Sequence, residues 1–66
     1  MKVTYDPRTD SLSILLKEGC QVAESEEDRP GVILDYDETG QLIAIEILDA
    51  SKRVSDARKI EYQLMD

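Results

Sequence analysis

The sequence predicts a small α+β fold: an antiparallel β-meander of about five strands, followed by one short helix. Three observations predict it. Apolar and polar residues alternate in several short stretches, and turn-forming residues separate these stretches. The two most apolar stretches lie in the middle of the chain, on either side of the sequence "DETG". After residue 49 the alternation gives way to a helix-like pattern, and the 66 residues make one domain, 1–66.

The N-terminal part of the chain predicts two strands joined by a turn. In "KVTYD", Val3 and Tyr5 share one face, as in a half-buried strand. The sequence "DPRTD" follows, with Pro7 well placed to set a turn. In "SLSILLK", leucine and isoleucine again alternate with serine, which predicts the second strand.

Three further strands follow, each bounded by turn signals. Gly19 in "EGC" is free to adopt positive φ, and the weaker strand "QVAESEE" comes next. Its carboxylates, Glu24 and Glu26 among them, are typical of an edge strand protected by charge. After "DRPG" come the two strongest strands, "GVILDYD" and "QLIAIEIL". Gly40 between them fits the left-handed position of a hairpin loop.

A short helix is expected after residue 49. Asp49 at the start of "DASKRV" can cap it by accepting hydrogen bonds from backbone N–H groups two or three residues further on. We expect this helix to end near Ala57.

Residues 58–65, "RKIEYQLM", allow two interpretations. Ile60, Tyr62 and Leu64 alternate as in a strand, whereas Val54, Ala57 and Leu64 could instead extend a helical stripe. A sixth short strand is the favoured interpretation, because the alternating residues include a β-branched and an aromatic side chain.

The stretch "DYDETGQLIAIE" nearly matches the calcium-loop pattern. Asp35, Asp37, Gly40 and Glu46 occupy the right positions. A calcium loop of this kind needs helices on both sides, whereas here the flanks are strands. Glu46 would lie four residues along its strand, roughly 13 Å from the turn. We therefore expect a soluble turn and no metal site.

The central hairpin also predicts an interface. If Asp37 pairs with Gln41, both faces of the hairpin are apolar, which one short helix cannot cover. One face then carries Val32, Leu34, Tyr36, Leu42, Ala44 and Leu48. The other face carries the proposed interface residues Ile33, Ile43, Ile45 and Ile47. We therefore expect a homodimer.

Composition narrows the partners and the location. The chain holds fifteen acids and eight bases, a net charge of −7, which argues against binding to nucleic acid or to an anionic membrane. A local contact with such a partner stays possible only at the basic residues near the end, which are Lys52, Arg53, Arg58 and Lys59. The chain has no apolar run long enough to cross a membrane and no hydrophobic block near its start, and Cys20 is its single cysteine. These features predict a cytoplasmic protein.

The residues that carry common enzyme chemistry are missing or isolated. Histidine is absent, which removes His-dependent triads and His-ligated metal sites. Cys20 has no base near it in sequence, and no phosphate-binding glycine loop is present. We therefore expect no catalytic, cofactor-binding or metal-binding residues and no cofactor, and a non-enzymatic protein is favoured over an enzyme.

The pieces "VTYDPRTDSLSILL", "VAESEE" and "PGVILDYDETGQLIAIEILDASKR" resemble a small bacterial and archaeal family called domain of unknown function 2283. The resemblance runs from about Lys2 to Val54. Its most specific parts are "YD" before the first turn, "GVILDYD", the Gly40 turn and "IEILDASKR". The second strand, "TDSLSIL", is slightly more polar than the family pattern.

The resemblance implies a small β-meander with a helix, no assigned enzyme activity and no site residues that could be carried over. Some family members are thought to lie beside small toxin-like genes, which would imply an antitoxin role. We assign structural roles to four residues: a buried ring to Tyr5, turn formation to Asp6 and Asp35, and the helix cap to Asp49.

Two functions follow as hypotheses. The favoured one is an uncharacterised small acidic protein that acts as a homodimeric interaction module, antitoxin-like in binding a basic protein partner. The alternative is a ligand- or metal-binding protein or enzyme, with a carboxylate-based site formed between subunits.

Overall fold

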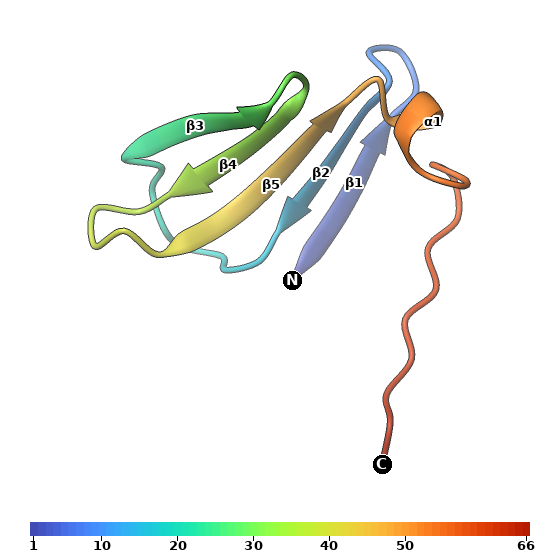
Figure 1. The fold of residues 1–66 in the computed structure, drawn as a ribbon. Helices are drawn as coiled ribbons and strands as arrows, with labels where there is room; N and C mark the ends of the chain where they lie inside the picture. The colour runs from blue at the N-terminus through green and yellow to red at the C-terminus, as the bar shows by residue number, and fades with distance from the viewer.

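The computed structural model describes residues 1–66 as one five-stranded antiparallel sheet with a single short helix (Figure 1). The α+β class, the five strands and the helix after residue 49 are confirmed. The elements are β1 (Lys2–Asp6), β2 (Ser11–Leu15), β3 (Glu24–Arg29), β4 (Val32–Tyr36), β5 (Leu42–Leu48) and α1 (Ala50–Arg53).

The strands do not lie in sequence order. The order across the sheet is β1-β2-β5-β4-β3. The hairpin β1–β2 and the meander β3–β4–β5 therefore join where β2 pairs with β5. The segment after β2 passes the end of β5 and leads to β3 at the opposite edge of the sheet (Figure 1). This leaves β1 and β3 as the two edge strands.

The register of the β4–β5 hairpin differs from the expected one by a single residue. Asp37 N–H donates to the Gln41 carbonyl at 3.0 Å, as expected. One extra residue in β5, opposite the step from Asp35 to Tyr36, then shifts the pairing. Leu34 consequently pairs with Ile45, where the unshifted register would have paired it with Ala44.

The shift corrects the expectation of a hairpin that is equally apolar on both faces. A displacement of one residue in a strand moves its side chains to the other face. Ile45 and Ile47 now share a face with Leu34 and Val32, while Ile33 pairs with Glu46 on the opposite face. One side of the sheet therefore gathers most of the apolar side chains.

We call this side the apolar face and define it by the direct pairings and by the alternation along each strand. Its members are Val3, Tyr5, Leu12, Ile14, Val32, Leu34, Tyr36, Leu42, Ile43, Ile45 and Ile47. The opposite side, which we call the mixed face, carries Ser11, Ser13, Leu15, Ser25, Glu27, Ile33, Asp35, Ala44, Glu46 and Leu48.

Very little of the chain is buried. Only four residues are buried: Gly31, Asp35, Ile43 and Ala50. The rest of the apolar face is half-buried, because no second layer of structure covers it. The molecule is a slab with extents of 35 × 33 × 19 Å.

Helix α1 is held at the end of the sheet by Asp10, which corrects the assignment of the cap to Asp49. Asp49 has a φ of 53° and makes no side-chain capping hydrogen bond. The carboxylate of Asp10 accepts from Ser51 N–H at 3.0 Å and from Ser51 Oγ at 2.6 Å. The Asp10 carbonyl also accepts from Ala50 N–H at 2.9 Å. The helix has only four residues and ends at Arg53, earlier than the expected end near Ala57.

The final segment, residues 58–65, forms neither the sixth strand nor a helix. It runs away from α1 as an extended chain that pairs with no strand (Figure 1). Its large apolar side chains Ile60, Tyr62, Leu64 and Met65 are 66–82% exposed.

Candidate functional site: the apolar face of the sheet

Two rows of directly paired residues cross all five strands on the apolar face. The first row consists of Val3, Ile14, Ile45, Leu34 and Glu26. The second row consists of Tyr5, Leu12, Ile47, Val32 and Arg29. Cross-strand contacts of this kind stabilise the sheet laterally. They leave the outward surface of each side chain open, so the face is a continuous apolar surface with charge only at β3.

The surface area shows how much of the molecule is left open. The chain exposes 5462 Å². A compact monomer of this mass would expose about 4,200 Å², so the chain exposes about 1,200 Å² more. The radius of gyration is 12.7 Å, against about 10.8 Å for a compact chain of 66 residues. A single-layer sheet and an extended final segment account for both differences.

The structure divides the four isoleucines of the expected interface. Ile43, Ile45 and Ile47 lie on the apolar face by alternation along β5, and Ile43, near the β4–β5 turn, is only 1% exposed. Ile33 lies on the mixed face beside Glu46. Sequence reasoning did not include Val3 and Leu12 in this surface, although their alternation in the first two strands was a usable signal.

The mixed face contains a carboxyl pair that sequence reasoning did not single out. Asp35 is 5% exposed and accepts a hydrogen bond from Ser25 Oγ at 2.6 Å. Glu46 lies beside Asp35 on the next strand. Hydrogen bonding to Asp35, partial burial and the negative charge of Asp35 together raise the pKa of Glu46 above its usual value. Asp35 is thus a buried strand residue, which corrects its assignment as a turn former.

The Asp37 side chain stabilises the β4–β5 turn through hydrogen bonds. Its Oδ1 accepts from Thr39 N–H at 2.9 Å, Thr39 Oγ1 at 2.7 Å and Gln41 N–H at 3.0 Å. These donors lower the pKa of Asp37, with the Thr39 hydroxyl contributing most. Glu46 lies on the mixed face against Asp35, away from this turn. The calcium-like spacing thus describes a strand, a turn and a second strand, and nowhere in the chain do three acidic, histidine or cysteine side chains gather to hold a metal.

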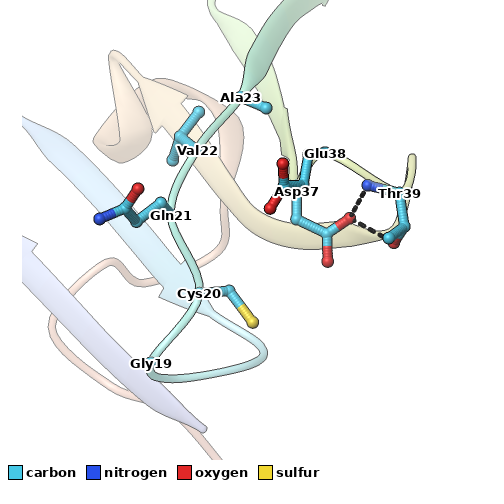
Figure 2. A pocket seen from close by; sticks show the side chains of 8 residues that line it. All are labelled: Gly19, Cys20, Gln21, Val22, Ala23, Asp37, Glu38 and Thr39. Atoms are coloured by element: carbon cyan, nitrogen blue, oxygen red, sulfur yellow. Dashed lines mark hydrogen bonds between the residues drawn. The ribbon is translucent and has the colours of Figure 1, made fainter.

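A shallow hollow of about 500 Å³ lies between this turn and the segment before β3 (Figure 2). Residues 19–23 and 37–39 line it. The Cys20 side chain points toward Asp37 and Thr39 across the space, but the hydrogen bonds of Asp37 already hold the turn together (Figure 2). The Asp37 Oδ1 is therefore engaged with the backbone and hydroxyl of the turn.

Asp10 links β1 to the helix. In addition to holding Ser51, it accepts a hydrogen bond from Tyr5 Oη at 2.7 Å. Hydrogen bonds from the Ser51 hydroxyl and the Tyr5 hydroxyl lower the pKa of Asp10. The hydrogen bond between Tyr5 and Asp10 also raises the pKa of Tyr5. The Tyr5 ring is half-buried, not fully buried as expected. Asp6 forms the first turn as expected, since its carboxylate accepts from Arg8 N–H at 2.9 Å.

No helix of the structure is long and apolar enough to span a membrane.

Comparison with known proteins gives one family and one relative of note. The chain is 38% identical over 52 residues to an uncharacterised protein of Methanocaldococcus jannaschii. That alignment covers 79% of this chain and 43% of the relative, so the chain spans less than half of the relative's length. No solved structure matches the chain significantly. The model of a family described as protein of unknown function (DUF2283) matches residues 2–51, which include all five strands and the start of the helix, and the chain belongs to this family.

Proposed function

We propose that this chain is a non-enzymatic protein-interaction module that acts as a cytoplasmic homodimer through its apolar face. One observation carries the proposal: the apolar face runs from β1 to β4 with no second layer of structure over it. A stable interface of standard size buries about 800 Å² on each partner. The excess of about 1,200 Å², to which the single-layer sheet and the final segment both contribute, is large enough to contain such an interface.

The chemistry of the face supports a second copy as the partner. Its central row holds Ile14, Ile45 and Leu34, with no charged side chain among them. Glu26 and Arg29 lie together at one border of the face. A two-fold axis can place the Glu26 of one copy near the Arg29 of the other, and two-fold dimers are the commonest symmetric oligomers. Branched aliphatic side chains each gain roughly 1.5–3 kcal/mol from full burial.

The matched variants Ile45→Asp and Ile33→Asp test the face directly. Both place a carboxylate at an isoleucine of the central hairpin, but only residue 45 lies on the apolar face. Ile45→Asp should elute as a monomer or fail to fold, because the interface would enclose an unpaired charge. Ile33→Asp should remain a dimer in light scattering after gel filtration. A wild-type-like dimer of Ile45→Asp would refute the proposed interface.

A second surface supports an antitoxin-like role toward a basic protein partner. The edge strand β3 carries Glu24, Glu26, Glu27 and Asp28, and all of its residues are exposed. A basic partner would be attracted to this edge, with an association rate that falls as salt is added. Replacing Glu24 and Asp28 by glutamine and asparagine should weaken such binding without changing dimer mass. Capture of a basic partner that is insensitive to both salt and these changes would count against it.

A further inference from the structure

We propose that the free edge of β1 is a docking site for the final segment of a second copy, whose residues 59–64 add to it as an antiparallel sixth strand. This inference rests on the homodimer proposed above and names a second contact between the two chains. It identifies both the surface, which is the outer side of β1, and the occupant, which is the segment "KIEYQL".

The two edges of the sheet differ in how open they are to another strand. The β3 edge is guarded by a run of acidic side chains and an irregular register between Glu27 and Arg29. Such charges and bulges are devices that block strand addition. β1, "KVTYD", pairs regularly with β2 along its whole length and has neither proline nor bulge. Its outer backbone groups are free and in a position to pair.

The final segment already has the shape and pattern of a strand. It is extended, and Ile60, Tyr62 and Leu64 lie on one side of it by alternation. Lys59 and Glu61 lie together on the other side, as their salt bridge of 3.3 Å shows. The apolar side is 66–80% exposed, so the single chain leaves it without a partner.

An antiparallel alignment matches both sides of the segment to β1. Placing Tyr62 opposite Val3 puts Ile60 opposite Tyr5, which extends the apolar face by one strand. The same register places Lys59 opposite Asp6 on the mixed face, an opposite-charge pair. Pairs of this kind directly across two strands stabilise a sheet.

The direction of the chain also fits. After α1 the final segment runs back opposite to the direction of β1 (Figure 1). Its start is close enough to the end of β1 for the charge of Arg58 to act on the Tyr5 hydroxyl. Within one chain the segment nevertheless stays clear of the sheet, with its apolar side chains exposed. A second copy, brought near by the apolar face, provides the β1 edge that the segment can reach.

Site-specific cross-linking tests the pairing and identifies the donor chain. In a Cys20→Ala background, one chain carries Val3→Cys and an isotope-labelled chain carries Tyr62→Cys. Mixing and mild oxidation should give a disulfide between the two chains, because paired strand residues lie within the Cα separation that a disulfide spans. Mass spectrometry of the linked peptides identifies the two chains.

The control replaces Tyr62→Cys by Glu61→Cys, whose side chain would face the other side of the strand. It should link to Val3→Cys at least about tenfold less. A disulfide that forms within a single diluted chain carrying both Val3→Cys and Tyr62→Cys would overturn the assignment to a second copy. The absence of any link in a mixture that light scattering shows to be dimeric would also overturn it.

A separate variant distinguishes this contact from the apolar-face dimer. Ile60→Ser with Tyr62→Ser and Leu64→Ser should raise the dissociation constant of the dimer about tenfold, whereas Glu61→Ser with Gln63→Ser should not. If wild-type chains are monomers, the proposed function fails together with this inference. If they are dimers and the apolar triple variant binds as tightly as wild type, only the inference about the final segment fails.

Discussion

At the scale of single residues, two carboxyl groups affect stability in opposite directions. Asp10 is stabilised in its charged form by Ser51 and Tyr5, so its pKa is lowered. Glu46 lies against the buried Asp35, so its pKa is raised. A lowered carboxyl pKa adds stability that is lost as the pH falls, and a raised one subtracts stability as the pH rises.

Asp10→Asn should lower the melting temperature at pH 7, because it weakens the contacts that tie the helix to the first turn. The native pKa of Asp10 lies below its unfolded value of about 3.9, so its stabilisation is complete above that value and is lost as the pH falls through the native pKa. Thermal unfolding from pH 7 to pH 3 should show the gap between variant and wild type closing in acid. An equal gap at both ends would show that the charge of Asp10 is irrelevant. Asp56→Asn, in the exposed turn after the helix, is the control.

Glu46→Gln should raise the melting temperature at pH 7. The native pKa of Glu46 lies above its unfolded value, so the pair is favourable below the unfolded pKa and loses stability as the pH rises through the native pKa. Glutamine removes the charge that Asp35 opposes. The gain should shrink as the pH falls to and below the unfolded pKa of Glu46, because the native side chain then takes up a proton. The control Glu38→Gln, at the exposed turn, should leave the melting temperature unchanged both at pH 7 and in acid. A Glu46→Gln variant that is less stable than wild type at pH 7 would contradict this account.

The roles of single residues were only partly predictable from the sequence. The turn residue Asp6 was found because its partner, Arg8, lies two positions away. The helix cap was misassigned to Asp49 because the true anchor, Asp10, lies 41 residues from Ser51 along the chain. Local patterns report local hydrogen bonds, whereas this contact exists only after the sheet has brought the first turn to the end of β5.

At the scale of elements, one backbone detail decides which side chains share a face. The five strands and the helix could be placed from alternation and turn signals. The extra residue in β5 could not be predicted, because a bulge changes which residues pair across two strands, and neither strand's own sequence records that pairing. That residue unites three isoleucines with Leu34 and Val32 and sends Ile33 to the other face. The strand order could not be predicted from the sequence either. It depends on the pairing of β2 with β5, which are far apart along the chain.

The turn between β3 and β4 is the second point at which the helix is held. Gly31 is buried with a φ of +87°, its N–H donates to Glu27 at 2.8 Å, and its carbonyl accepts from Leu48 N–H. The Arg53 guanidinium of α1 donates to the carbonyl of Pro30 next to it. A short helix therefore connects the two halves of the sheet.

Gly31→Ala should destabilise the chain more than Gly40→Ala. Both glycines have positive φ, which costs a residue with a side chain about 1–2 kcal/mol. At Gly31 a Cβ would also lie 2.6 Å from the Arg53 guanidinium, whereas at Gly40 nothing lies within 4 Å. Urea unfolding measures the difference, and Arg53→Ala should reduce the extra loss at Gly31. Equal losses at both glycines would mean that Arg53 moves aside without cost.

At the scale of the whole molecule, the chain has too little structure to bury its own apolar residues. Its charge and length predicted a small acidic domain, and its isoleucine-rich hairpin predicted an uncovered surface. The true extent of that surface, from Val3 on β1 to Leu34 on β4, depended on the strand order and the register. No second layer covers the apolar face, and the extended final segment of the same chain pairs with no strand. Both features support the homodimer that we propose.

The mass of the wild-type chain in solution tests the central claim most directly. Multi-angle light scattering from micromolar concentrations upward should give twice the chain mass of 7.5 kDa. Dilution should convert the dimer to a less stable monomer, and the melting temperature should fall with it, because dimerisation stabilises the folded state by mass action. A single-chain mass at every concentration, together with a cooperative and concentration-independent melt, would show that the apolar face needs no second copy.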